Sequence, residues 1–139
     1  MSVLATMLKK SHWLSTKFQE ELERIGLHLT RTEHFVIANI AAGECRASRI
    51  ARNLGISRQA VSQILAGLVS RGFVTTRQDP NNGRVRILEI SGGAGGQGIC
   101  VAALKRFDED IKQIVGADDF ECFCRVLNTD WQLRSEDEP

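Results

Sequence analysis

A run of glycines in the second half of the chain has the spacing of a nucleotide-binding loop. Residues 93–98, GAGGQG, match the pattern G-x-G-x-x-G, with a β-rich run before them and a helical run after them. In dinucleotide-binding folds, such a loop lets the backbone approach a pyrophosphate at the N-terminus of a helix. That chemistry also requires a buried parallel strand before the loop and an acidic residue at the end of the next strand.

The residues around the loop do not meet these requirements. Residues 84–90 carry three charged side chains, which predicts a half-exposed antiparallel strand. Asp110 and Asp118 lie in or just after a helical pattern, with no strand before them. We therefore expect no nucleotide and no other cofactor.

Charge is distributed unevenly along a chain whose formal net charge is only +1. Residues 46–86 contain eight arginines and a single acid, Asp79, whereas residues 108–139 contain ten acids and three bases. A segment as basic as the first attracts polyanions such as nucleic acid. A solvated arginine face is the alternative interpretation.

The basic segment has the element order of a winged helix-turn-helix. Ile50, Ala51 and Leu54 form a short helical stripe, which Gly55 ends with a left-handed turn. Ser57 is placed to cap the next helix, whose apolar face leads to a C-cap at Gly72. Two strands, over residues 73–78 and 84–90, are then joined by the turn residues DPNNG.

Helices flank this segment on both sides. An amphipathic helix is predicted over residues 11–27, and Thr30 with Glu33 forms a capping box for a helix that ends near Gly43. The second of these helices is expected to bury Phe35, Val36, Ile40 and Ala41. A long helix is predicted over residues 99–115 and a last one over residues 119–133.

The capped helix presents polar side chains opposite its apolar face. Arginine can pair bidentately with guanine, and glutamine with adenine. Free N–H groups at the helix N-terminus can also bind phosphate. The candidate base-contacting residues are Ser57, Arg58, Gln59, Ser62 and Gln63.

The predicted hairpin and the residues that flank the helix-turn-helix add further basic and amide groups. A two-stranded wing with a polar tip can reach the minor groove or the phosphate backbone. The candidate contacts there are Arg46, Arg49, Arg77, Asn81, Asn82, Arg84 and Arg86.

In these features the sequence resembles the MarR family of winged-helix regulators. The resemblance covers roughly residues 11–115 and is strongest in LTRTEHFVIANI, in SRIARNLGISRQAVSQILAGLVSRGFV and in TRQDPNNGRVRILEIS. It implies a homodimer whose two winged lobes bind a pseudo-palindromic operator in double-stranded DNA. It also implies that a small amphipathic ligand or an oxidant weakens DNA binding.

The chain departs from the family pattern in two places. The wing tip, Asn82-Gly83-Arg84, has one arginine fewer than family members commonly carry. Glycine also occupies five of the seven positions 92–98, where the family begins its long dimerisation helix. Glycine disfavours a helix by roughly 1 kcal/mol per position relative to alanine. We therefore interpret Gly93, Gly95 and Gly96 as a hinge between the winged lobe and the dimerisation helix.

The remaining chemically active side chains predict neither an enzyme nor a metal site. Cys122 and Cys124 would point about 200° apart on a helix, so they would not share a metal from one face. Structural roles are the first interpretation of these two cysteines and of Cys45 and Cys100, and redox sensing stays open. No nucleophile–base pair stands out. His12, His28 and His34 match no metal motif, although they could gather with Glu33 near a pocket.

The sequence therefore predicts a mainly α protein with a small β-hairpin wing. The expected parts are a dimerisation helix in residues 1–29, a winged helix-turn-helix in 30–91 and C-terminal dimerisation helices with an acidic tail in 92–139. The expected function is that of a cytoplasmic, sequence-specific transcriptional regulator, a repressor in the first instance, with no membrane association. The alternative is a protein–protein interaction module whose basic lobe docks an acidic partner.

Overall fold

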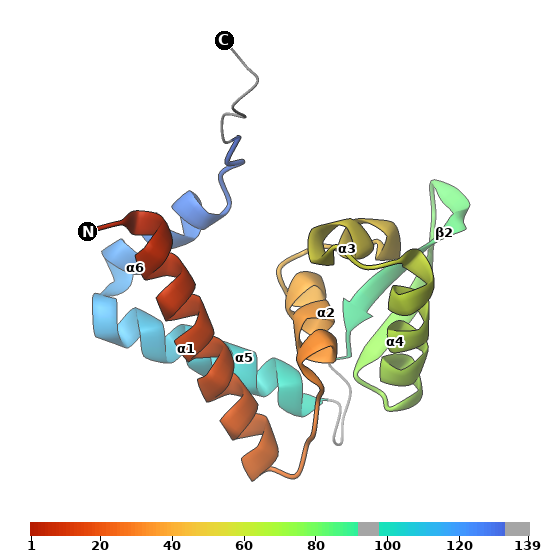
Figure 1. Ribbon diagram of the computed structural model, residues 1–139, viewed down its shortest axis with the longest axis horizontal. Helices are drawn as coiled ribbons and strands as arrows, with labels where there is room; N and C mark the ends of the chain where they lie inside the picture. The colour runs from red at the N-terminus through yellow and green to blue at the C-terminus, as the bar shows by residue number, and fades with distance from the viewer. Residues whose placement is uncertain (92–97, 133–139) are drawn as a thin grey trace. The chain divides into compact units, whose positions relative to one another are not determined.

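A computed structural model describes residues 1–91 and 98–132 of the chain. The described residues form helices and one two-stranded antiparallel sheet, as predicted (Figure 1). The chain divides into two compact units, Met1–Ala103 and Leu104–Pro139. Gly93, Gly95 and Gly96, which the sequence analysis interprets as a hinge, lie outside the described part. No helix among the described residues is long and apolar enough to span a membrane.

Helix α1 (Val3–Arg24) starts eight residues earlier than the apolar pattern predicts. The hydroxyl of Ser2 caps it by accepting a hydrogen bond from the N–H of Ala5 at 3.3 Å. Only Phe18 and Leu22 are buried in α1, so the first turns lack the buried stripe from which sequence analysis recognises a helix. The cap and helix propensity extend it instead.

Helix α2 (Arg31–Ala41) begins at the predicted capping box. The hydroxyl of Thr30 accepts a hydrogen bond from the N–H of Glu33, and the Glu33 carboxylate accepts one from the N–H of Thr30. The buried face differs from the prediction, because Phe35 is 36% exposed and His34 and Ile37 are buried. Ala41 is also exposed. The buried stripe is rotated because the ring of His34, which the apolar pattern does not include, packs against Phe18 of α1.

Helices α3 (Ala47–Leu54) and α4 (Arg58–Ser70) form the predicted helix-turn-helix. Gly55 ends α3 with φ of 65°, a left-handed conformation that glycine adopts without a Cβ clash. The hydroxyl of Ser57 caps α4 by accepting from the N–H of Ala60 at 3.0 Å. The inner sides of the two helices meet in the core, and the buried side chains there are Ile50, Ala51, Val61, Leu65 and Leu68.

Strands β1 (Val74–Asp79) and β2 (Asn82–Ile90) form the wing, which packs against α2 and α4 (Figure 1). Regular antiparallel pairing runs from Val74 with Ile90 to Gln78 with Arg86. Beyond it the register shifts, and Asp79 pairs with Asn82 across a tight turn. The strands therefore extend into the predicted five-residue turn, and only Pro80 and Asn81 connect them, so the predicted connection was too long.

Helices α5 (Gly98–Val115) and α6 (Ala117–Leu127) complete the described chain. Helix α6 ends at Leu127, so the predicted helix over residues 119–133 extended too far. After Asn128 the chain turns, and the indole N–H of Trp131 donates to the carbonyl of Val126 at 3.0 Å. The predicted pattern was too long because the apolar Trp131 continued it without lying in the helix.

Candidate nucleic-acid interface

The first two turns of α4 present side chains to solvent where the sequence predicts base contacts. Arg58, Gln59, Ser62 and Gln63 are all exposed, because Val61, Leu65 and Leu68 take the inner face of the helix. Ser57 differs from the others, since its hydroxyl is occupied as the cap. Its position still leaves free backbone N–H groups of the first turn directed away from the helix, where an anion can bind.

The wing tip is held in shape by hydrogen bonds to its own backbone. The carboxylate of Asp79 accepts from the N–H of Asn81 at 2.8 Å, and the amide oxygen of Asn82 accepts from the N–H of Arg84 at 3.2 Å. Asn81, Asn82, Arg84 and Arg86 are exposed. Two of the predicted wing contacts therefore shape the tip through these bonds, Asn81 with its backbone N–H and Asn82 with its side-chain amide oxygen.

Three of the eight arginines of the basic segment are engaged in ion pairs. Arg46 pairs with Asp79 at 3.3 Å, and Arg77 pairs with Glu89 at 2.7 Å. Arg71 pairs with Glu33 at 3.0 Å. Within residues 1–91 and 98–132, the other five form no ion pair, namely Arg49, Arg52, Arg58, Arg84 and Arg86. Fewer arginines therefore carry an uncompensated positive charge than the sequence count suggests.

The Arg46 and Asp79 pair joins the start of α3 to the wing. Asp79 is buried, whereas half of the Arg46 side chain remains exposed. A buried carboxylate needs such a partner because desolvation of an unpaired charge is costly. The pair between Arg77 and Glu89 is exposed on both sides and crosses the two strands. Glu89 raises the pKa of the Arg77 guanidinium, so this arginine stays charged.

A groove joins the two predicted contact surfaces. It has a volume of about 650 Å³ and lies between α3, α4 and the hairpin. Arg46, Ser62 and Arg86, three of the predicted contact residues, line it from different elements together with apolar side chains such as Leu65 and Val69. The fold thus brings the helix and the wing of the prediction to one surface.

A second cavity, of about 700 Å³, lies between α1 and α2. His12 and His34 both line it, so two of the three histidines gather as the sequence suggested, whereas His28 does not. His34 packs against Phe18 with ring centroids 5.1 Å apart, and its burial lowers the pKa of the imidazole below 6.5. Phe35 also lines the cavity, which explains its exposed position on α2.

The cysteines show no metal-binding arrangement in the described part of the chain. Cys100 is buried, and desolvation raises the pKa of its thiol. Cys122 is exposed on α6 and Cys124 is partly covered. Across residues 1–91 and 98–132, no group of three or more histidine, cysteine or acidic side chains could hold a metal ion.

Sequence reasoning did not find the contacts of Arg71. The sequence count included it in the basic face, but its side chain lies against α2 and the loop before it. Its partners are 38 and 43 residues away, so no local spacing could have identified them. Of these two partners, sequence analysis assigns a local structural role only to Glu33, in the capping box.

A capped helix after a glycine turn, followed by a basic antiparallel hairpin, defines a winged helix-turn-helix, a fold that is used to bind DNA. The model of the MarR family matches residues 28–85, which covers the helix-turn-helix and most of the wing. This part of the chain, less than half of its length, is therefore similar to the MarR family. Members of the family are DNA-binding transcriptional regulators and not enzymes, in agreement with the sequence prediction.

Solved structures of such regulators share the fold. The transcriptional regulator Tm0710 from Thermotoga maritima is 18% identical, with 89% of this chain and 88% of that chain covered at a TM-score of 0.55. NadR in complex with 4-hydroxyphenylacetate is 18% identical, with 91% and 90% covered at 0.63. A MepR mutant from S. aureus bound to an oligodeoxyribonucleotide is 18% identical, with 91% and 94% covered at 0.52. No curated protein matches the sequence.

Proposed function

We propose that the protein is a homodimeric repressor that binds a pseudo-palindromic operator in double-stranded DNA. The observation that carries the proposal is the surface formed by the first turn of α4 and the wing. There, Arg58, Arg84 and Arg86 are exposed and form no ion pair within the described residues. Side chains left uncompensated beside a helix N-terminus suit a polyanionic partner.

In this proposal the N-terminus of α4 enters the major groove. Arg58 and Gln59 contact base edges, since arginine pairs bidentately with guanine and glutamine with adenine. Ser62 and Gln63, one turn further on, contact bases or the adjacent backbone. Ser57 caps the helix, and the backbone N–H groups beside it bind a phosphate.

The wing and the flank of α3 contact the backbone and the neighbouring minor groove. Arg84 and Arg86 supply the charge, and Asn81 and Asn82 form the tip. Arg49 extends the same charge from α3. Arg46 and Arg77 contribute less, because Asp79 and Glu89 already compensate them. Such contacts position the protein on DNA without selecting the sequence.

The proposed dimer rests on apolar side chains left uncovered at both ends of the chain. In α1, Leu4, Leu8 and Trp13 are 68%, 63% and 53% exposed. In the unit that holds α6, Ile114 is 82% and Phe123 49% exposed. Exposed large apolar residues at this density mark protein interfaces. The partner that covers these side chains is a second copy of the chain. Residues 1–29 and 92–139 are the proposed dimerisation parts, and residues 30–91 are the proposed DNA-binding lobe.

We further propose that a small amphipathic ligand regulates DNA binding. NadR was solved with 4-hydroxyphenylacetate. The repressor CouR was solved with a 23-mer DNA duplex; it is 22% identical, with 90% of this chain and 89% of that chain covered at a TM-score of 0.50. The cavity between α1 and α2 has polar and aromatic lining that suits such a ligand. The cytoplasm is the proposed location.

The test is selection of duplexes from a random library, followed by titration of the selected duplex against salt. A repressor of this kind keeps a preferred sequence at physiological salt, and log affinity falls linearly with log salt concentration. Weak, sequence-independent binding would overturn the proposal and would favour the basic lobe as a docking site for an acidic protein. Size measurement of the complex by light scattering gives the number of chains per duplex.

A further inference from the structure

The C-terminus of α4 is tied to the segment between α1 and α2 by one arginine. Arg71 is the C-cap of α4, and Gly72 follows with φ of 81°. The Nη1 group of Arg71 donates to a carboxylate oxygen of Glu33 at 3.0 Å, and Nη2 donates to the carbonyl of His28 at 2.6 Å. The guanidinium carbon lies 4.9 Å from the ring centre of Phe73. Both ends of the fork and one face of the guanidinium are thus occupied.

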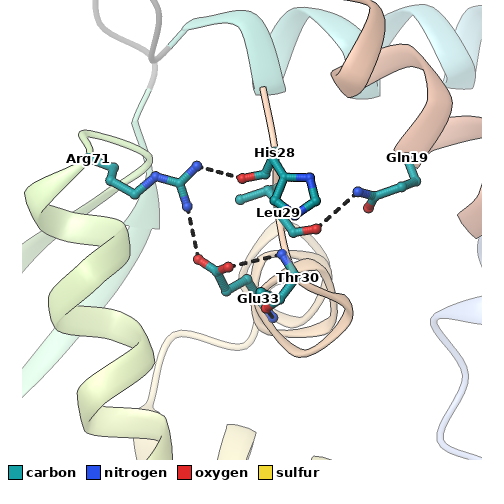
Figure 2. A network of polar contacts seen from close by, with 6 residues as sticks. All are labelled: Gln19, His28, Leu29, Thr30, Glu33 and Arg71. Carbon is teal, nitrogen blue, oxygen red and sulfur yellow. Dashed lines mark hydrogen bonds and ion pairs between the residues drawn. The ribbon is translucent and has the colours of Figure 1, made fainter. Parts of the chain in front are cut away.

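The partners of Arg71 are themselves fixed (Figure 2). The second carboxylate oxygen of Glu33 accepts from the N–H of Thr30 at 2.9 Å, as part of the capping box. The next carbonyl along the loop, that of Leu29, accepts from the side-chain amide of Gln19 at 3.0 Å. Consecutive carbonyls of one loop are therefore bonded from α4 and from α1.

This arrangement gives Arg71 a different position from the side chains proposed to contact DNA. The thirteen residues of α4 extend about 20 Å, so Arg71 and Ser57 lie at opposite ends of the helix. Only 17% of the Glu33 side chain is exposed, so the ion pair is partly shielded from solvent. An arginine that donates from its two Nη groups to two separate acceptors adds geometric specificity that lysine does not supply.

We infer that Arg71 is a positioning residue that fixes the direction of α4 relative to α1. The inference rests on the proposed function, in which α1 belongs to the dimerisation part and α4 contacts bases. In a dimer, the two recognition helices must match half-sites about one helical turn of DNA apart. A loosened joint would leave each α4 able to bind its half-site but would weaken the match to one spacing.

The experiment measures affinity for the selected operator, for a single half-site, and for operators with one or two base pairs inserted or removed between half-sites. Arg71→Met is expected to lower affinity for the native spacing about tenfold, the effect of losing roughly 1.4 kcal/mol. Half-site affinity stays unchanged, so the preference among spacings becomes flatter. Arg71→Lys is expected to behave similarly, because it keeps the charge but not the fork.

Two further variants keep the test decisive. Glu33→Gln preserves the capping box, in which glutamine also serves, and replaces the carboxylate oxygen that accepts from Arg71 with an NH2 group, which cannot accept. It is expected to flatten the spacing preference even if Arg71→Met does not fold. Arg24→Met removes an arginine from an ion pair within α1, outside the proposed DNA surface, and is the matched control, expected to keep the wild-type spacing preference.

The outcomes separate the inference from the function on which it rests. A wild-type protein without any spacing preference would overturn the dimeric operator proposal, and the positioning role with it. A sharp wild-type preference that persists in Arg71→Met and Glu33→Gln would overturn the positioning role alone. Equal loss of half-site and full-site affinity in Arg71→Met would also overturn it, because a direct phosphate contact produces that result.

Discussion

The two ends of α4 use the same residue type in opposite ways. At the N-terminal end, Arg58 is exposed and forms no ion pair within the described residues. At the C-terminal end, Arg71 makes an ion pair, a hydrogen bond to a backbone carbonyl and a contact with an aromatic ring. The difference lies in the acceptors that the fold brings to each end. A count of basic residues along the sequence therefore overestimates the charge available to DNA.

The middle of α4 joins these two ends and supplies the stability that both require. Val61 and Leu68 are fully buried, and Leu65 is nearly so. Changes there should affect both ends of the helix together, whereas changes at one end should leave the other intact.

The largest effect is expected from Leu68→Ala in the middle of α4. Leu68 is fully buried, so truncation should lower the free energy of unfolding by about 2–5 kcal/mol, from lost burial and from the cavity left behind. Urea denaturation followed by circular dichroism measures it. The neighbouring Val69 is 41% exposed, so Val69→Ala is the control and should cost far less. Equal losses in the two variants would show that the inner face is assigned wrongly.

A smaller effect is expected at the N-terminal end, where Ser57 caps the helix. Ser57→Ala removes the acceptor for the N–H of Ala60 and should lower the free energy of unfolding by about 1 kcal/mol. Ser57→Asp keeps a good cap but places a negative charge where phosphate should bind, so stability is retained and DNA affinity falls. Chemical denaturation and duplex titration separate the two effects. Undiminished DNA affinity in Ser57→Asp would remove the phosphate from this end of α4.

The smallest effect concerns pH and involves His34 of α2, which packs against Phe18 of α1. Burial lowers the pKa of His34 in the fold, so the unfolded chain binds more protons as pH drops below 6.5. The contribution of neutral His34 is therefore present above that pH and is lost as pH falls. Stability measured between pH 8 and pH 5 should decline less in His34→Gln than in the wild type. An equal decline in His34→Gln and in the wild type would show that the burial of His34 does not cause this pH dependence.

The features that sequence predicted correctly are local ones. Gly55, Ser57 and the capping box of Thr30 with Glu33 depend on residues within one turn of each other, and each is confirmed. The wing followed from alternation and turn residues over a short range. For the same reason, the order of helices and strands was predictable, whereas the contacts between side chains distant in sequence were not.

What sequence could not predict depends on distant contacts. Arg46 and Asp79 are 33 residues apart, and Arg71 and Glu33 are 38 apart. Neither pair has a local pattern, so the sequence assigned both arginines to one basic face. Phe35 was placed in the core because it is apolar, but it lines a cavity instead. Each error arose where tertiary packing, rather than periodicity, decides the environment of a side chain.

The most direct test of the account compares Arg58→Ala with Arg84→Ala on the selected operator and on its single-base variants. Arg58→Ala should cost about 1–3 kcal/mol and relax the preference at one base pair of each half-site. Arg84→Ala should weaken all sequences alike and reduce the salt slope by about 1. If Arg58→Ala instead lowered affinity for every sequence equally, the N-terminal end of α4 would not contact bases, and the central claim would be wrong.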